Sequence, residues 1–315
     1  MQTEDLKIVL KVSELKSISS AAASLDLSVA TASAAVKRIE NQLGAELFVR
    51  TTRHLRLSSV GERYIPQCKQ ALQMLEKAKL SMKEELEIVD GEMRIAASSD
   101  LGRNLANDWL NEFMDLYPKI ELRTFISDSN VDFYRDSIDM ALRYGAPKDS
   151  NLYGFKICNV PRLLCASQAY LDKYGTPNTV GELANHNALL YQLHDVLHDT
   201  WEFKCDGILH KVKLKGNRSS NDADLVRRWC VAGHGIAIKS CLDMAQDILD
   251  GNVVHLLPDS TPAPTELWLV APSRQSITPG VRLLRDMFRI KSEAVLMELV
   301  DAGAISKNTL NEYST

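Results

Sequence analysis

Residues 17–53 constrain the fold of this chain more than any other stretch. Two short segments with helical spacing meet there at a polar turn, residues 26–28. The first is rich in alanine, and Ser19 or Ser20 is placed to cap it. The second repeats apolar residues at spacings of three and four, which lie on one stripe of a helix: Val29, Ala32, Val36, Ile39 and Leu43. Gly44 then supplies a left-handed C-cap, so the pattern predicts two helices in contact across a tight turn.

The opposite face of the second helix is polar and basic. Its residues include no apolar side chain larger than alanine: Thr31, Ser33, Ala34, Lys37 and Arg38. Such a face suits the major groove of DNA, and we predict a helix-turn-helix whose recognition helix is capped by Ser28. Thr31 and Ser33 are predicted to touch base edges. Lys37 and Arg38 are predicted to contact phosphates, and Ser28 and Ala34 complete this DNA-binding surface.

An arginine-rich hairpin is expected after the recognition helix. Arg50, Arg53 and Arg56 recur around one turn, and we predict that they contact phosphates or the minor groove as a wing. Residues 37–63 contain six Lys or Arg against three Glu, whereas the whole chain has a formal net charge of −4. A compact basic patch on an acidic protein favours nucleic acid as its partner. The alternative is a solvated surface that binds nothing.

These residues resemble the N-terminal domain of LysR-type transcriptional regulators. The first half of the likeness is Ser17-x-Ser19-x-Ala21-Ala22-x-x-Leu25-x-Leu27-Ser28. The second half is Ser33-x-x-Val36-x-x-Ile39-Glu40-x-x-Leu43-Gly44-x-x-Leu47-Phe48-x-Arg50-x-x-Arg53, followed by Leu57-x-x-x-Gly61. Ala34 and Ala35 depart from the family, whose members often have Arg or Gln there. The resemblance implies a transcription regulator whose partner is double-stranded DNA.

A long helix is predicted for residues 59–89. It begins with capping-box spacing at Ser59 and Glu62, and its apolar residues recur as a heptad: Ile65, Cys68, Leu72, Leu75, Met82, Leu86 and Val89. Pro66 should distort its first turns. Because this helix is too long for the small domain before it, we expect it to pair with the same helix of a second chain. Self-association as a dimer or tetramer follows from this pairing.

Strands alternate with helices in the second half of the chain. Strands are expected at 93–97, 120–126 and 138–143, with helices at 101–117 and about 131–137. Such a βαβ series favours a mostly parallel sheet. A second series begins after Pro161. Two series joined by crossing strands indicate two lobes with a cleft between them.

The family resemblance continues more weakly through this half. Its motifs are Gly91-x-Met93-Arg94-Ile95, Tyr117-Pro118-x-Ile120, Ile138-Asp139-x-Ala141-x-Arg143-x-Gly145, Ser167-x-Ala169-Tyr170-Leu171, Gly175-x-Pro177 and Gly233-x-Gly235-Ile236-Ala237. The resemblance implies an effector-binding domain similar to periplasmic binding proteins, with the ligand between the lobes. Lys239 and Ser240 stand where a Leu-Pro pair is common in the family.

The expected fold is therefore α/β with three parts. An all-α winged helix-turn-helix DNA-binding domain occupies residues 1–58, and a linker or dimerisation helix occupies 59–89. A two-lobed effector-binding domain, similar to periplasmic binding proteins, occupies 90–300. Its first lobe is expected at about 90–161 and 267–300 and its second at about 162–266. Residues 301–315 are expected to form a loose polar tail.

A small organic effector is expected in the cleft. Ligands of open α/β sheets bind beyond the carboxyl ends of strands, where helix N-termini offer free N–H groups. The predicted effector residues are Ser98, Ser99, Ser129, Arg143, Ser167, Asn221 and Gly235. Serines at helix N-termini favour an organic acid as the effector. The alternative is that each serine only caps its own helix.

The sequence contains no motif that predicts catalysis. It has no GxSxG elbow, no P-loop and no Rossmann GxGxxG, so we expect neither an enzyme nor a cofactor. His194 and His198 have the spacing of a metal-binding helix turn, but the Glu of a zinc protease is missing. A solvated loop without metal is the preferred interpretation. The rival function is a solute receptor or a small-molecule enzyme with the same two-lobed fold.

The sequence also bears on the compartment. The first six residues are acidic and open a helix, so no secretory signal is expected. The six cysteines form no CxxC pair and are expected to be reduced. No apolar run approaches the roughly 20 residues of a membrane span. We expect a cytoplasmic protein without a membrane partner.

Overall fold

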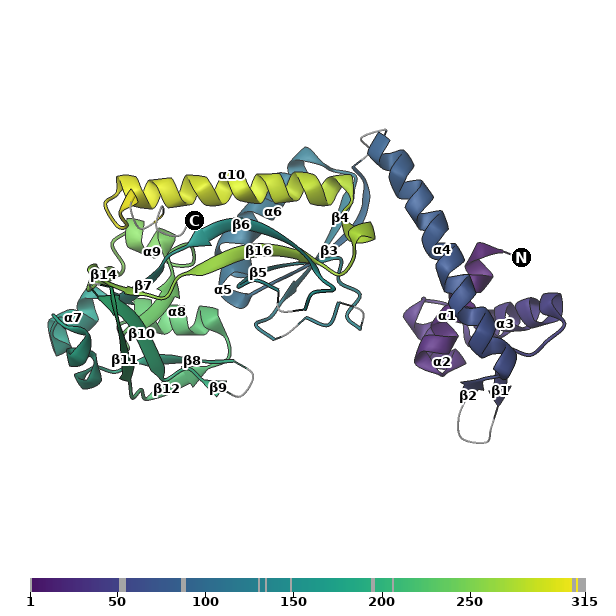
Figure 1. Ribbon diagram of the computed structural model, residues 1–315, viewed down its shortest axis with the longest axis horizontal. Coiled ribbons are helices and arrows are strands. Elements are labelled where there is room, and N and C mark those ends of the chain that lie inside the picture. Colours follow the sequence, from purple (N-terminus) through teal and green to yellow (C-terminus); the bar gives the residue numbers. More distant parts are fainter. Residues whose placement is uncertain are drawn as a thin grey trace. The chain divides into compact units, whose positions relative to one another are not determined.

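The chain forms two compact units, Met1–Leu86 and Glu87–Thr315 (Figure 1). The computed structural model describes residues 2–50, 55–85, 89–129, 131–133, 135–147, 149–193, 196–205, 207–307 and 310. Among the described residues, the main hydrophobic cluster of the first unit contains residues from Leu6 to Ile65, and the clusters of the second unit begin at Val89. Among the helices of the described residues, none is long and apolar enough to cross a membrane.

The first unit contains helices followed by a hairpin. Its elements are α1 (Thr3–Leu15), α2 (Ile18–Ser24), α3 (Val29–Leu43), β1 (Phe48–Arg50), β2 (Leu55–Leu57) and α4 (Ser59–Glu85). The turn between α2 and α3 confirms the predicted helix-turn-helix. Ser17, and not Ser19 or Ser20, caps α2, because the helix begins at Ile18. Gly44 ends α3 with φ 65°, as predicted.

Small side chains let the first three helices pack closely. Ala21 and Ala22 of α2 and Ala32 and Ala35 of α3 are all fully buried. Val12 of α1 is buried against them, in the same core. Burial of many small residues at helix crossings brings backbones near one another and leaves no voids. The alanine-rich sequence thus determines how α2 and α3 meet.

The helix α4 begins on the first unit and exposes apolar residues farther along. Ile65, Cys68 and Leu72 are at most 9% exposed. Met74 is 72% exposed and Leu75 is 52% exposed. The helix includes Pro66 and is assigned as one element over its whole length. Its first half therefore belongs to the packing of its own unit, whereas Met74 and Leu75 do not.

The first sheet of the second unit has the strand order β4-β3-β5-β16-β6. The strands are β3 (Gly91–Ala97), β4 (Ile120–Ile126), β5 (Met140–Tyr144), β6 (Tyr153–Val160) and β16 (Thr265–Ala271). β3 is parallel to β4 and β5, but β16 is antiparallel to β5 and β6. The sheet is therefore mixed, because β16 returns from the second half of the chain. The prediction of a short helix at about 131–137 was wrong, because the described residues of this range form turns and no helix.

Helices cover this sheet. They are α5 (Ser99–Leu101), the π-helix η1 (Gly102–Ala106), α6 (Asn107–Leu116) and, after the 3₁₀ turn η3 (Arg274–Ser276), α10 (Pro279–Asp301). The first three follow one another without a break after β3. Trp109 and Phe113 of α6 are buried in the same core as Phe288 of α10. This helical layer places Ser99 at the carboxyl end of β3.

The second lobe is built around short strands. β7 (Arg162–Ala166) lies between β13 (Ala237–Ser240) and β14 (Val254–Leu256), and both pairings are antiparallel. Other sheets have the orders β12-β8-β9 and β11-β10-β15. Their strands are β8 (Leu189–Leu193), β9 (Val196–Leu197), β10 (Thr200–Cys205), β11 (Ile208–Lys213), β12 (Arg218–Ser220) and β15 (Ser260–Pro262). The helices are α7 (Gln168–Tyr174), η2 (Val180–Asn185), α8 (Ala223–Val231) and α9 (Ala245–Leu249).

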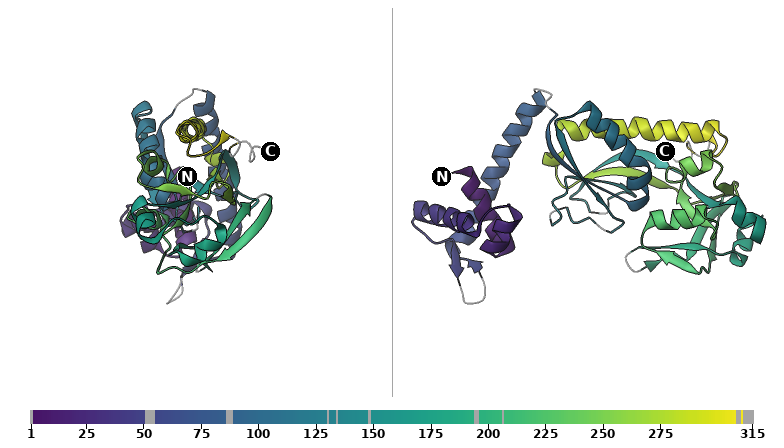
Figure 2. Two further views of the ribbon diagram at one scale, coloured as in Figure 1. Left: turned by 90° about the vertical axis from the view of Figure 1, so that its left-hand side faces the viewer. Right: turned by 180° about the vertical axis from the view of Figure 1, so that it is seen from behind.

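The two lobes share structure. β6 and β16 run from the first sheet toward the second lobe, and α10 runs along both (Figures 1 and 2). α10 packs on β6 and α6 and also on α9 of the second lobe. Leu163 of β7 and Val226 of α8 belong to the same buried cluster as Ile95 of β3. The lobes therefore form one unit with polar contacts across its middle.

Candidate functional sites

The recognition helix α3 separates a buried face from an exposed one. Its N-cap is Ser28, whose hydroxyl accepts the backbone N–H of Thr31 at 3.1 Å. Ala32, Ala35, Val36 and Ile39 are buried, and the exposed face includes Thr31, Ala34, Lys37 and Arg38, with Ser33 half-buried. The residues predicted for DNA contact therefore lie together along one side of the helix.

Arg38 is held by a carboxylate from another helix. Its Nε donates to Asp5 Oδ2 at 3.0 Å and its Nη2 to Asp5 Oδ1 at 2.5 Å. Asp5 is only 5% exposed, whereas the Arg38 side chain is about half exposed. The hydrogen bond to Arg38 lowers the pKa of Asp5, and Asp5 raises the pKa of Arg38. A bidentate pair fixes the direction of the guanidinium. The only signal for it in the sequence is a carboxylate beside the apolar stripe of α1.

The hairpin is anchored to the recognition helix. Its register pairs Phe48 with Leu57 and Arg50 with Leu55. Glu40 Oε1 of α3 accepts the backbone N–H of Leu47 at 2.8 Å and that of Phe48 at 3.2 Å. Residues 51–54, including the predicted wing residue Arg53, lie outside the described residues, as does the Arg50 side chain. Glu40, which sequence reasoning passed over, joins the base of the wing to α3.

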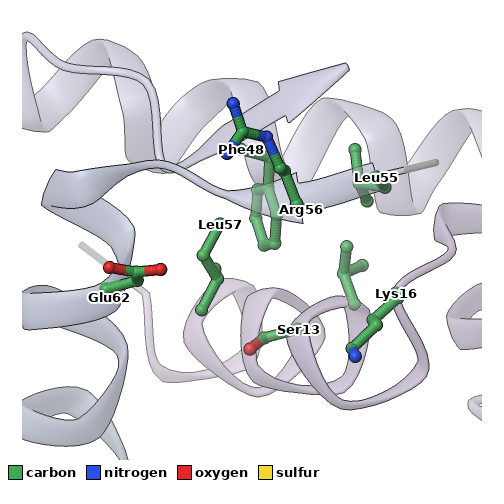
Figure 3. Close-up of a pocket in the computed structure, with 8 residues that line it drawn as sticks. Ser13, Lys16, Phe48, Leu55, Arg56, Leu57 and Glu62 are labelled. Carbon is green, nitrogen blue, oxygen red and sulfur yellow. The ribbon is translucent and has the colours of Figure 1, made fainter. Parts of the chain in front are cut away.

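A hollow of about 470 Å³ lies between α1 and the hairpin (Figure 3). It is lined by Val12, Ser13, Lys16, Phe48, Leu55, Arg56, Leu57 and Glu62. Val12 and Phe48 are buried core residues, and charged groups lie at Lys16, Arg56 and Glu62. The sequence did not predict this hollow. It belongs to the packing of the first unit and is separate from the contacts between the lobes.

Those contacts centre on Ser99, the first residue of α5. Its backbone N–H donates to Asp128 Oδ1 at 2.7 Å, and its hydroxyl donates to Asp128 Oδ2 at 2.6 Å. Ala223 N, at the start of α8 in the second lobe, donates to Asp128 Oδ2 at 2.7 Å. The N–H of Asp224 donates to Ser99 Oγ at 3.2 Å. The carboxyl ends of β3 and β4 therefore meet the N-terminus of α8.

A second group of contacts flanks this junction. Arg103 of η1 donates to both carboxylate oxygens of Asp222, at 2.8 and 3.1 Å, and Asp222 also caps α8. Asn104 Nδ2 donates to Asp224 at 2.8 Å. Asp224 is buried and also receives Arg228 Nε at 2.9 Å. The carboxylates of Asp222 and Asp224 thus accept hydrogen bonds from the first lobe, and Asp224 also accepts one from its own helix.

A buried charge pair continues the contact. Lys239 of β13 forms an ion pair with Asp100 of α5, and its Nζ also donates to the Ala223 carbonyl at 2.9 Å. Burial, assisted by Asp243, raises the pKa of Asp100 to about 7 against the opposing effect of Lys239. Tyr144 donates to Asp243 Oδ1 at 2.7 Å and lies 2.8 Å from Ser240 Oγ. Lys239 and Ser240, which depart from the family pattern, are therefore both used to join the lobes.

The predicted effector residues divide into several environments. Ser99 lies in the junction. Among the described residues, Ser98 Oγ is buried without a hydrogen-bond partner. Ser129 and Asn221 are exposed near the junction in sequence, and Arg143 is half-buried in β5. Ser99 is therefore engaged by Asp128, and the roles of Ser98 and Ser99 in effector binding stay predictions.

Ser167 and Gly235 have local structural roles. Ser167 is buried and caps α7 by accepting the N–H of Tyr170 at 3.3 Å, which is the alternative that the sequence left open. A Cβ at Gly235 would lie 2.4 Å from the carbonyl oxygen of Asn187, so glycine is required for the close approach of two backbone segments. Sequence reasoning missed Asp128 and Arg103, and it noted Lys239 only as a departure from the family, because their partners are remote in the chain. The one local signal was Asp128 itself, which lies two residues after Ile126, the last residue of β4.

No metal site is formed by the described part of the chain, where groups of three or more His, Cys, Asp or Glu in position to hold an ion are absent. His194 lies outside the described residues. The ring of His198 stacks on Tyr191 with centroids 6.2 Å apart. His198 therefore has a packing partner in the second lobe.

Two family descriptions match the chain. Residues 3–62 match a bacterial regulatory helix-turn-helix protein of the lysR family, and residues 87–292 match a LysR substrate binding domain. The regulator DmlR of Escherichia coli is 28% identical over 90% of this chain and 92% of its own length. The regulator CrgA of Neisseria meningitidis is 30% identical over 82% of this chain and 86% of its own length.

Solved structures agree with these matches. The structure of CrgA from N. meningitidis has a TM-score of 0.59 and 27% identity, and covers 92% of this chain and 99% of its own. The full-length virulence activator AphB of Vibrio cholerae has a TM-score of 0.56 and 27% identity, and covers 91% and 98%. These relatives are transcriptional regulators and not enzymes. With a helix-turn-helix unit and an effector-binding unit in this order, the chain belongs to the LysR family of transcriptional regulators.

Proposed function

We propose that α3 reads DNA through Thr31 and Ser33, while Lys37, Arg38, Arg50 and Arg53 contact phosphates. DNA binding itself follows from the family. The roles of Thr31, Ser33, Lys37 and Arg38 rest on the geometry of α3, whereas those of Arg50 and Arg53 rest on the sequence pattern of the hairpin. The observation that carries the roles on α3 is the exposed row Thr31, Ala34 and Lys37 beside a buried stripe of Ala32, Ala35, Val36 and Ile39. Val29 and Leu43, which were predicted on the same stripe, are exposed because they lie at the two ends of the helix. The Asp5 carboxylate orients Arg38 and leaves about half of its side chain open to a phosphate.

Fluorescence anisotropy with DNA from the chain's own upstream region tests these roles. Lys37→Ala should weaken binding to all sequences and reduce the slope of log K against log salt by about one unit, because one phosphate contact is lost. Ser33→Ala should instead reduce discrimination between sequences. Lys7→Ala is the matched control, since Lys7 pairs with Glu4 on α1. A Lys37→Ala slope equal to that of wild type would remove Lys37 from the DNA surface.

We also propose that the small-molecule effector is an organic acid bound where the lobes meet. The supporting observation is the set of donors at this junction, Ser99 N, Ser99 Oγ and Ala223 N, which already hold a carboxylate. Backbone N–H groups at helix starts favour negative charge. The proposed first lobe spans about 90–161 and 267–300, and the second spans about 162–266. The effector prefers one arrangement of the lobes and so changes the affinity for DNA.

Isothermal titration of the full chain with a panel of small organic acids tests this site. Ser98→Ala/Ser99→Ala should weaken acid binding at least tenfold, because a charge-assisted hydroxyl contact is lost. Ser13→Ala, a serine of the first unit, is the control. Unchanged acid binding in the double variant would remove the junction as the effector site.

A further inference from the structure

The Asp128 carboxylate is held by donors from both lobes. Ser99 gives its N–H and its hydroxyl from the first lobe, at 2.7 and 2.6 Å. Ala223 gives its N–H from the second lobe at 2.7 Å, and the Tyr191 hydroxyl of β8 also hydrogen-bonds to Asp128. These are the interactions that a free carboxylate would make at the same place. The chain therefore fills the anion position with a side chain of its own.

Charge around the junction prevents a second anion from joining the first. Asp100, Asp222 and Asp224 lie next to Ser99 and Ala223 in the chain or in contact with them. The cations paired with these carboxylates are already engaged: Lys239 pairs with Asp100, Arg103 with Asp222 and Asp224, and Arg228 with Asp224. An added carboxylate would meet uncompensated repulsion in a half-buried site. An acid can enter only where Asp128 leaves.

Asp128 can leave its position on Ser99 and Ala223 without becoming a buried charge that lacks a partner. It is half-buried, and Ser127 and Ser129 on either side are exposed. Once displaced, its carboxylate would reach water, so it would not be buried without a partner, which is the costly outcome for a charge. A tethered group also competes at an effective concentration in the millimolar range. Weak acids at low concentration therefore lose to Asp128, and only an acid with further contacts displaces it.

We propose that Asp128 is a tethered carboxylate that occupies the anion subsite of the effector and sets its specificity. This proposal rests on the proposed function in one respect: the effector binds at the junction of the two lobes. An acid effector then acts by replacing Asp128 on Ser99 and Ala223, which frees the segment after β4. Without the effector, Asp128 holds the lobes together.

Chemical rescue tests the proposal. Asp128→Ala should lower the melting temperature of the full chain by about 4–8 °C, because donors from both lobes lose their acceptor. Sodium acetate or formate, on the order of 100 mM, should restore most of this loss, whereas sodium chloride of equal ionic strength should not. Wild-type protein should not respond to acetate. An equal response of the variant to acetate and chloride overturns the proposal, and so does an unchanged melting temperature.

Two further variants complete the test. Asp286→Ala removes an exposed carboxylate that pairs with Arg285 on α10, and it should show no acetate-specific rescue. Asp128→Asn keeps the shape and one acceptor oxygen if the alanine variant does not fold. It should lose about half as much melting temperature, because the charge-assisted part of the bonds is gone; a wild-type value overturns the proposal. Since stability is measured without DNA, failure here is distinct from failure of the acid-responsive regulator itself.

Discussion

Asp5 and Arg38 illustrate how single residues position the DNA-binding surface. A buried carboxylate on α1 orients a cation on α3 through two hydrogen bonds. Asp5→Asn should therefore lower the urea midpoint of the first unit at pH 7. The pKa of Asp5 is lowered from 3.8 in the folded state, so its contribution is complete above pH 3.8 and is lost as the pH falls through the lower folded value.

The lowered pKa of Asp5 determines how the stability difference between wild type and Asp5→Asn changes with pH. The difference between wild type and Asp5→Asn should be constant from pH 5 to pH 7 and should shrink below pH 3.8. Urea unfolding followed by circular dichroism at several pH values measures it. Glu4→Gln, which removes a carboxylate from an exposed pair with Lys7, serves as control. A difference that persists undiminished at pH 2 would contradict the role of the Asp5 charge.

Residue roles were predictable from the sequence only where the partner is local. Ser28 caps α3 as predicted, because its partner Thr31 is three residues away. Asp5 and Arg38 are 33 residues apart, and Asp128 and Ala223 are 95 apart. Such pairs depend on how separate elements pack, and periodicity within one element contains no information about them. The predicted roles of Thr31, Ser33 and Lys37 at DNA stay predictions.

At the scale of elements, different residues of the recognition helix are expected to stabilise the fold and to contact DNA. Ser28→Ala removes the acceptor of the Thr31 N–H and should cost about 1 kcal/mol of the free energy of unfolding. Ser33 is half-buried within the helix and is not its N-cap, so Ser33→Ala should change stability by less than about 0.5 kcal/mol while weakening DNA binding. Urea unfolding and anisotropy on both variants measure the two effects. Equal loss of stability in both would refute this division.

The helix α4 offers a second prediction at this scale. Leu75 continues the spacing of Cys68 and Leu72 but is 52% exposed in one chain. A partner helix that covers it would bury apolar area, so Leu75→Glu should shift the protein toward monomer and weaken binding to paired half-sites more than to a single one. Light scattering after size exclusion measures the mass. Gln70→Glu, on the exposed surface of the same helix, is the control; an unchanged mass in Leu75→Glu would exclude this seam.

Element types were predicted well where periodicity is long and poorly where segments are short. α3 and α10 have repeated apolar spacing over several turns, and both are helices. The expected helix at about 131–137 has room for only two turns, and turns took its place. The mixed sheet could not be foreseen from the βαβ pattern alone. β16 pairs with β5 and β6 from more than 100 residues away, and sequence order does not specify the direction of that pairing.

At the scale of the whole molecule, the two units have separate hydrophobic cores. The clusters of the second unit contain no residue before Val89. Residues 87–315 alone should therefore fold cooperatively, with the melting temperature of the corresponding transition in the full chain, and should not bind DNA. Calorimetry and anisotropy measure these properties. A fragment that unfolds without cooperativity would show that the first unit supplies stability across the boundary.

The helix α10 also limits how the protein can move. It packs on β6 and α6 at the first sheet and on α9 in the second lobe, and beyond its end His255 Nδ1 donates to the Ala304 carbonyl at 3.2 Å. Because α10 packs on both lobes, it opposes a large opening of one lobe away from the other. Only a slight rocking is compatible with it. An effector bound at the junction, as proposed, would therefore cause only a small displacement between the lobes, and rigid connections would be needed for that displacement to alter DNA binding.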